Sequence, residues 1–197
     1  MQPPRWVVEG GTRLDLDEFG AEFSTAWSRL ESRFLKIECW QSYQESAANE
    51  SQEAYRRGDL ESSLDLLKKE AESDRPLYED VRARAIEFAR VRVVQEPVTE
   101  YLRYELMSYR IRATMGENIE VVRESSETPL PNGETFDFLL FDRRTALVHD
   151  YGHGPTGVQA GGWLVRDPRT VGALEERALA LRAGAVPLER FLAQSEL

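Results

Sequence analysis

The sequence predicts an α+β domain in which a helical N-terminal half packs on a mixed, mainly antiparallel sheet of about five strands with flanking helices. Apolar residues recur at helical spacing through residues 17–88, whereas short β-branched and aromatic runs dominate residues 89–197. The chain has 197 residues and is 41% hydrophobic, which suffices for a buried core. We therefore expect one domain over residues 1–197, with residues 1–16 as a flexible extension.

The first strong element is an amphipathic helix that follows Leu14-Asp-Leu-Asp17, where an aspartate can cap it, and runs to about Trp40. Its apolar face is Phe19, Phe23, Ala26, Trp27, Leu30, Phe34 and Ile37. The alternative is that the helix ends near Ser32 and that residues 35–39 alternate as a short strand. We favour the long helix. Short helical patterns follow at residues 51–57, at 60–72 and after Pro76.

In the second half of the chain, the spacing of apolar residues changes from that of helices to that of strands. We expect strands at residues 90–95, 119–123, 136–142, 145–151 and 162–165 and helices at 98–114, 168–182 and 187–192. The turn-rich residues 129–133 precede the third of these strands, and residues 142–144 link a hairpin. Gly152-His-Gly-Pro-Thr-Gly157 lacks the spacing of a phosphate-binding loop and is interpreted as a turn with positive backbone angles.

Charge and composition exclude several classes of protein. The net charge is −10, with −8 in residues 1–80 and +2 in residues 81–123. The acidic N-terminal segment repels phosphate backbones, so we expect no direct binding to nucleic acid. No apolar run approaches the ~18 residues that span a bilayer, and residues 1–11 do not resemble a signal peptide, so we expect a cytoplasmic protein without membrane contact. The single cysteine, Cys39, excludes an internal disulfide and a cysteine metal cluster.

Arginines gather in the middle of the chain and give one candidate anion or ion-pair pocket. Glu105 falls in the centre of the apolar face of the expected helix at residues 98–114, and a carboxylate on such a face needs a partner. The favoured interpretation is a structural cross-link from Glu105 to an arginine of the preceding strand or of the same helix. The alternative is a functional acid/base or anion site. The candidate residues are Arg90, Arg92, Glu105, Arg112 and Glu117.

No further motif predicts chemistry. His149 and His153 lack a third metal ligand, no serine-hydrolase motif occurs, and Cys39 is expected to be a small core thiol. We predict no catalytic residues, no metal ligands and no cofactor. The aromatic cluster of Phe19, Phe23, Trp27, Phe34 and Trp40 is interpreted as core, with a groove for a partner helix as the alternative.

Several stretches together resemble an actinobacterial family of unknown function over about residues 17–195. They are Arg33-Phe-Leu-Lys-Ile-Glu-Cys-Trp-Gln41, Phe88-Ala-Arg-Val-Arg-Val-Val-Gln-Glu-Pro-Val-Thr-Glu-Tyr-Leu-Arg-Tyr-Glu105, Gly116-Glu-Asn-Ile119, Phe136-Asp-Phe-Leu-Leu-Phe-Asp142 and Ala185-Val-Pro-Leu-Glu-Arg-Phe191. Members of such families are often encoded beside Xre-type helix-turn-helix regulators. The resemblance therefore implies a regulatory partner and implies no catalytic residue.

The leading hypothesis is a regulatory protein that binds a helix-turn-helix transcriptional regulator, with its acidic N-terminal half facing a basic surface. The alternative is an enzyme or toxin directed at nucleotides or nucleic acid, which would use Arg90, Arg92 and Arg112 for phosphate and Glu105 or Glu117 as acid/base. A weaker third hypothesis is a small-ligand sensor with a pocket between sheet and helices. The oligomeric state is left open.

Overall fold

All the strands of the described residues join one mixed sheet, in the order β1-β7-β6-β5-β2-β3-β4-β8. The computed structural model describes residues 3–43, 49–124, 134–152 and 158–195. The pairs β2–β3 and β3–β4 are parallel and the other five are antiparallel. The strands are β1 Thr12–Leu14, β2 Arg33–Glu38, β3 Glu87–Val94, β4 Ile119–Arg123, β5 Phe138–Phe141, β6 Thr145–Asp150, β7 Gly161–Val165 and β8 Val186–Pro187.

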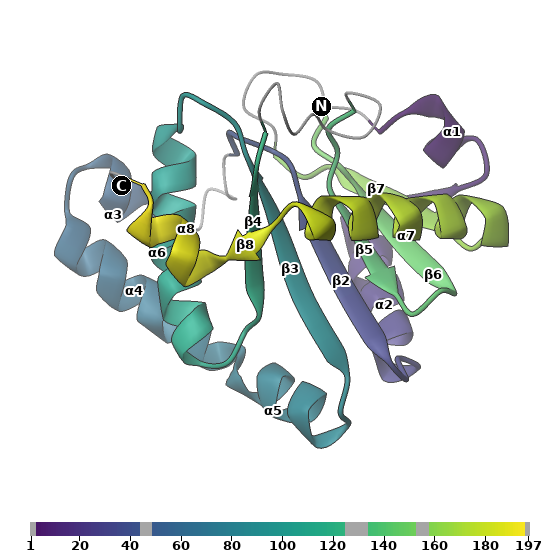
Figure 1. Cartoon of the computed structure of the whole chain (residues 1–197), viewed down its shortest axis with the longest axis horizontal. Coiled ribbons are helices and arrows are strands. Elements are labelled where there is room, and N and C mark those ends of the chain that lie inside the picture. Colours follow the sequence, from purple (N-terminus) through teal and green to yellow (C-terminus); the bar gives the residue numbers. More distant parts are fainter. Residues whose placement is uncertain (1–2, 44–48, 125–133, 153–157, 196–197) are drawn as a thin grey trace.

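Helices cover both faces of this sheet (Figure 1). The helices are α1 Arg5–Val8, α2 Leu16–Ser28, α3 Glu50–Arg56, α4 Leu60–Ser73, α5 Arg75–Ala83, α6 Glu100–Thr114, α7 Pro168–Ala183 and α8 Leu188–Ala193. Helix α7 lies across one face, and its core includes Val171 and Leu174. On the opposite face, α2 packs over the β7–β6 side and α6 packs over β3 and β4. The region between α2 and α6 on that face holds the candidate site.

Strand β2 shows why one face of the sheet differs from the other. Side chains alternate between faces along a strand, and Leu35, Ile37 and Cys39 all join the core beneath α7. The alternate residues of β2 point to the opposite face of the sheet. The first of them, Phe34, packs under α2. They continue with Lys36 and Glu38, so this face changes along the strand from apolar to charged.

The expected helix to Trp40 is wrong, because the alternative strand is the one that forms. Helix α2 ends at Ser28, and β2 begins at Arg33. The Asp142 carboxylate accepts hydrogen bonds from the backbone N–H groups of Glu31, Ser32 and Arg33, at 3.1, 2.9 and 2.9 Å. These three donors come from a segment more than 100 residues away in sequence, so no local pattern could show that the helix stops here.

Two further predictions about the architecture are wrong. The sheet has eight strands in the described residues, not about five, because β1, β2 and the short β8 were not expected. The N-terminal half is therefore not a helical layer packed on a separate sheet. Within residues 3–16, the described part of the expected extension, β1 pairs with β7 and the Val7 side chain of α1 is fully buried.

Other predictions are confirmed. The mixed, mainly antiparallel sheet forms, and the strand at Ile119–Arg123 has the predicted bounds. Asp15 caps α2, and Glu18 closes the reciprocal capping box. The predicted helix at residues 168–182 begins with Pro168 after the capping Asp167. The turn at residues 129–133, His153 and most of the glycine-rich loop lie outside the described residues.

Gly162 of β7 lets α2 approach the sheet. A Cβ atom at this position would lie 2.3 Å from the Val148 carbonyl oxygen and 2.6 Å from the Phe19 ring. Phe19 of α2 packs into the core of this face. The close contact between helix and strand therefore requires glycine here.

Candidate functional site

The pairing of β2 with β3 and β5 places the side chains between α2 and α6 in rows that run across the strands. Phe34 is paired with Phe88 of β3 and with Phe141 of β5. One step along the same face, Lys36 is paired with Arg90, and the next step pairs Glu38 with Arg92. An aromatic row is therefore followed by two charged rows.

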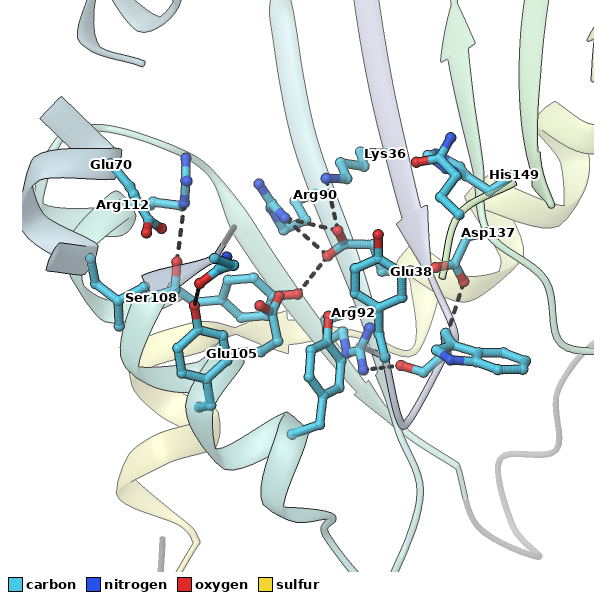
Figure 2. A pocket seen from close by; sticks show the side chains of 18 of the residues that line it. Lys36, Glu38, Glu70, Arg90, Arg92, Glu105, Ser108, Arg112, Asp137 and His149 are labelled. Atoms are coloured by element: carbon cyan, nitrogen blue, oxygen red, sulfur yellow. Dashed lines mark hydrogen bonds and ion pairs between the residues drawn. The ribbon is translucent and has the colours of Figure 1, made fainter. Parts of the chain in front are cut away.

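A cavity of 380 Å³ lies over the charged rows. Lys36 and Glu38 line it from β2, Arg90 and Arg92 from β3, and the α6 residues from the opposite side (Figure 2). Helix α4 and the segments around β5 and β6 complete it. The other lining residues are Trp40, Tyr43, Asn49, Leu67, Glu70, Asp74, Tyr101, Tyr104, Glu105, Ser108, Tyr109, Arg112, Asp137, His149, Tyr151 and Gln159.

Glu38 is the centre of a buried ion-pair network. Its carboxylate contacts Arg90 Nη1 at 2.9 Å and Lys36 Nζ at 2.8 Å, and it accepts a hydrogen bond of 2.6 Å from the Tyr109 hydroxyl. Burial alone would raise the pKa of Glu38. The charges of Arg90, Lys36 and Arg92 outweigh burial and hold that pKa well below its ordinary value. Glu38 is therefore ionised.

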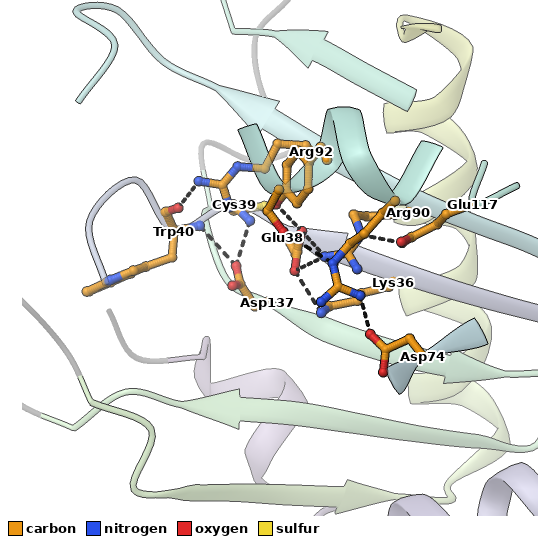
Figure 3. Close-up of polar contacts among 12 residues, drawn as sticks. Lys36, Glu38, Cys39, Trp40, Asp74, Arg90, Arg92, Glu117 and Asp137 are labelled. Carbon is orange, nitrogen blue, oxygen red and sulfur yellow. Dashed lines mark hydrogen bonds and ion pairs between the residues drawn. The ribbon is translucent and has the colours of Figure 1, made fainter. Parts of the chain in front are cut away.

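Arg90 connects this network to Glu117. Its Nε contacts the Glu117 carboxylate at 2.5 Å (Figure 3). The other Glu117 oxygen accepts a hydrogen bond of 2.5 Å from the Tyr78 hydroxyl. Glu117 is 4% exposed and does not line the cavity. Of the five predicted pocket residues, the structure thus brings four to the cavity and places Glu117 behind Arg90.

Glu105 does not form the expected cross-link to an arginine. No hydrogen bond or ion pair joins it to another described residue, whereas Arg90 pairs with Glu38 and Glu117, and Arg112 pairs with Asp74. Burial, and after it the charge of Glu38, raises the pKa of Glu105. The cavity therefore holds two carboxyl groups whose pKa values move in opposite directions.

Arg92 has a different environment from the other basic residues of the cavity. It is 2% exposed, and it donates a hydrogen bond from Nη2 to the Trp40 carbonyl oxygen. It makes no ion pair with a described residue, and its Nε has no acceptor among them. Two other cavity residues also carry a buried nitrogen without a described partner, namely Trp40 at Nε1 and His149 at Nδ1.

His149 and Asp137 define the side of the cavity near β5 and β6. Burial, followed by the charge of Lys36, lowers the pKa of His149 to about 4, so the imidazole is neutral at pH 7. The Asp137 carboxylate accepts backbone hydrogen bonds from Cys39 and Trp40 and a hydroxyl bond of 2.7 Å from Tyr151. Burial raises the pKa of Asp137. These bonds hold the end of β2 against β5.

Cys39 is fully buried in the core beneath α7, as predicted for a small core thiol. Burial, together with the charge of Asp137, raises its pKa to about 12, so the thiol is unreactive at neutral pH. Within the described ranges no group of three or more His, Cys, Asp or Glu side chains has the arrangement of a metal site. None of the helices described is both long and apolar enough to cross a bilayer.

A family model describes this chain over residues 21–193, and its members share a domain of unknown function, DUF6879. The chain belongs to the DUF6879 family. A comparison with curated proteins finds no match. The predicted resemblance to a family of unknown function is thus confirmed, and the family name assigns no chemistry to the residues of the cavity.

The DUF6879 cavity also contains residues that sequence reasoning missed. Lys36 and Glu38 fall within the expected long helix, whereas their alternation with Leu35 and Ile37 is the pattern of the strand that forms. Asp137 falls in a run that is otherwise apolar, and a charged residue within a central strand was the available signal. The contributions of Trp40 and His149 depend on tertiary contacts and gave no such signal.

Proposed function

We propose that the protein binds a small organic anion in the charged cavity. The observation that carries this proposal is Arg92, a guanidinium that is 2% exposed and has no ion-pair partner among the described residues. A buried guanidinium normally forms an ion pair, whereas the charges of Glu38 and Asp137 act on Arg92 without forming one. Arg92 Nε and Trp40 Nε1 can only donate hydrogen bonds, and neither has an acceptor in the described part of the chain. An anionic group in the cavity would bring a compensating charge close to the Arg92 guanidinium.

The dimensions and walls of the cavity suit such a ligand. Its 380 Å³ falls within the range of roughly 300–1,000 Å³ that is usual for small-molecule sites. Trp40 stacks on Tyr151 at a centroid distance of 5.4 Å, and Tyr43 meets Tyr151 edge-on. Rigid aromatic side chains with polar tips give contact area as well as hydrogen bonding.

The test is thermal denaturation in sodium phosphate and in sodium acetate, each compared with sodium chloride at equal ionic strength. We expect the melting temperature to rise with one of the two anions through mass action, and Arg92→Gln to abolish the rise. Arg123→Gln, which removes an exposed arginine of β4, is the matched control and should keep it. Arg92→Lys retains the charge and should keep part of the rise. An equal rise in Arg92→Gln, or none in the wild type, would overturn the proposal.

A second candidate is an enzyme that acts on nucleotides or nucleic acid with Glu105 as acid/base. The specific observation in its favour is the pair of carboxyl groups, Glu38 held ionised and Glu105 with a raised pKa, beside the same cavity. Nucleoside triphosphates and a short RNA should then be consumed by the wild type and spared by Glu105→Gln. Turnover that is equal in both proteins would exclude Glu105 from the chemistry.

The partnership with an Xre-type helix-turn-helix regulator also stays a proposal, as do the actinobacterial origin and the cytoplasmic location. The support for the partnership is the net charge of −8 in residues 1–80, which suits a basic partner surface. Co-purification with the regulator encoded beside the gene, at roughly 0.15 M salt, tests it. Independent elution of the two proteins would argue against the pair.

A further inference from the structure

We infer that the anion bound in the charged cavity carries an aromatic ring, and that this ring occupies a second cavity that adjoins the first. The inference rests on the proposed anion site. The second cavity has a volume of 270 Å³. Its apolar lining residues are Phe19, Phe23, Trp27, Phe34, Leu77, Tyr78, Phe88 and Leu139.

The two cavities meet at common side chains. Lys36, Asp74, Arg90, Arg112 and His149 line both of them. A molecule that extends past these side chains therefore passes from a charged environment to an aromatic one. Strand register explains the continuity, since Lys36 and Arg90 of the first charged row follow Phe34 and Phe88, which lie two positions earlier on the same face.

The second cavity offers ring faces and ring edges. Phe23 and Trp27 stack at a centroid distance of 5.9 Å with an interplanar angle of 12°. Phe34 meets both of them edge-on, at 6.3 and 5.3 Å. Phe23 and Trp27 are only half-buried, so apolar surface remains for a ligand to cover. A flat ring inserted here gains the edge-to-face contacts that aromatic groups favour.

Charge at the common wall also favours an aromatic group over an aliphatic one. Lys36, Arg90 and Arg112 are cationic, and cations favour the face of an aromatic ring within about 6 Å. The protein already uses this contact, because the Arg90 guanidinium lies 5.0 Å from the centroid of Tyr109. A ligand with a ring joined to an anionic group would thus bind through the anionic group in the first cavity and through the ring in the second. The cations shared by the two cavities would lie beside the ring.

Calorimetric titration of the full chain with matched probes tests the inference. The probes are acetate, phenylacetate and cyclohexylacetate, together with phosphate and phenyl phosphate, so the arms separate a carboxylate head from a phosphate head. We expect the phenyl compound of one pair to bind at least about tenfold more tightly than its parent anion, because binding removes the apolar surface of the ring from water. Cyclohexylacetate should bind more weakly than phenylacetate.

Substitutions test whether the tighter binding of the phenyl compound comes from the second cavity. Trp27→Ala should lower the affinity for the phenyl compound about tenfold and leave that for the parent anion unchanged, whereas Trp27→Phe should retain most of it. Trp6→Ala removes a surface tryptophan that lines neither cavity and should change nothing.

The outcomes separate the two proposals. Equal affinity for the parent anion and its phenyl derivative in both pairs would overturn the aromatic inference and leave the anion site standing. Where phenylacetate binds more tightly than acetate, equal affinity for cyclohexylacetate and phenylacetate would do the same. If no probe of either pair binds, both fall. A phenyl preference that survives Trp27→Ala would move the ring out of the second cavity and overturn the inference too.

Discussion

Glu38 and Glu105 show how the same side chain acquires different properties from its neighbours. Glu38 has Arg90, Lys36 and Tyr109 within hydrogen-bonding distance, so its charge is compensated. Glu105 faces the same cavity without a described partner. Burial and the nearby charge of Glu38 therefore raise the pKa of Glu105 by more than the charges of Arg92, Arg90 and Lys36 lower it.

This contrast predicts opposite effects of the same substitution. Glu38→Gln should destabilise the protein by about 3–5 kcal/mol at pH 7, because it leaves buried cations without their partner. Glu105→Gln should stabilise it by up to about 1 kcal/mol at pH 7, because it removes a carboxylate whose burial is only partly offset by nearby cations. A raised folded-state pKa costs stability as the pH rises through it, so the gain should vanish below pH 4.5. Urea denaturation of both variants measures this, and a destabilised Glu105→Gln would contradict it.

His149 predicts a separate dependence on pH. Its folded-state pKa is about 4 and its ordinary value is 6.5, so the unfolded chain binds the proton first as the pH falls. The free energy of unfolding should therefore decline between pH 6.5 and 4, by on the order of 3 kcal/mol. Subtracting the curve of His149→Gln from that of the wild type isolates the contribution of this residue. Parallel curves over that window would show that His149 titrates normally.

At the scale of elements, the junction between α2 and β2 decides which face the charged residues occupy. Apolar residues continue through this junction at a spacing that fits a helix, which is why residues 14–40 read as one element. The Asp142 carboxylate binds three successive backbone N–H groups and the Ser32 hydroxyl there, which stops the helix and starts the strand. Asp142 itself has a φ of 51°, a conformation that aspartate and asparagine adopt more readily than most residues.

Asp142→Ala should therefore destabilise the protein by about 2–4 kcal/mol, because several backbone donors lose their acceptor and alanine is strained at this φ. Asp142→Asn keeps one acceptor oxygen and should cost less than half as much. Asp65→Ala, on an exposed face of α4, serves as the control and should change the free energy of unfolding by less than about 0.5 kcal/mol. A loss no greater than that of the control would contradict this role of Asp142.

At the scale of the whole molecule, the N-terminal residues contribute to both layers of the fold. Val7 packs into the core beneath α7, and Leu14 packs into the core beneath α2. Strand β1 pairs with β7 and occupies one end of the sheet, while β8 occupies the other. The first residues therefore hold both helical layers and one sheet edge in place.

Deletion of residues 1–14 should lower the free energy of unfolding by about 3–6 kcal/mol, since burying each large apolar side chain is worth about 1.5–3 kcal/mol. For a chain of this size that corresponds to a fall of roughly 10 °C in melting temperature. Arg5→Ala, which removes only an exposed pair within α1, should leave the melting temperature unchanged. An unaffected deletion variant would restore the expectation of a flexible extension.

The sequence by itself determined the α+β class, most elements of the second half, the buried thiol and four of the residues that line the cavity. These follow from local periodicity, capping residues and the rarity of charge on an apolar face. Only the tertiary structure decided that residues 33–38 are a strand, that Glu38 rather than Glu105 pairs with Arg90, and that Arg92 forms no ion pair with a carboxylate of the described residues. The physical reason is distance in sequence, because the groups that settle each of these points lie about 50 to more than 100 residues apart and meet only when the sheet forms.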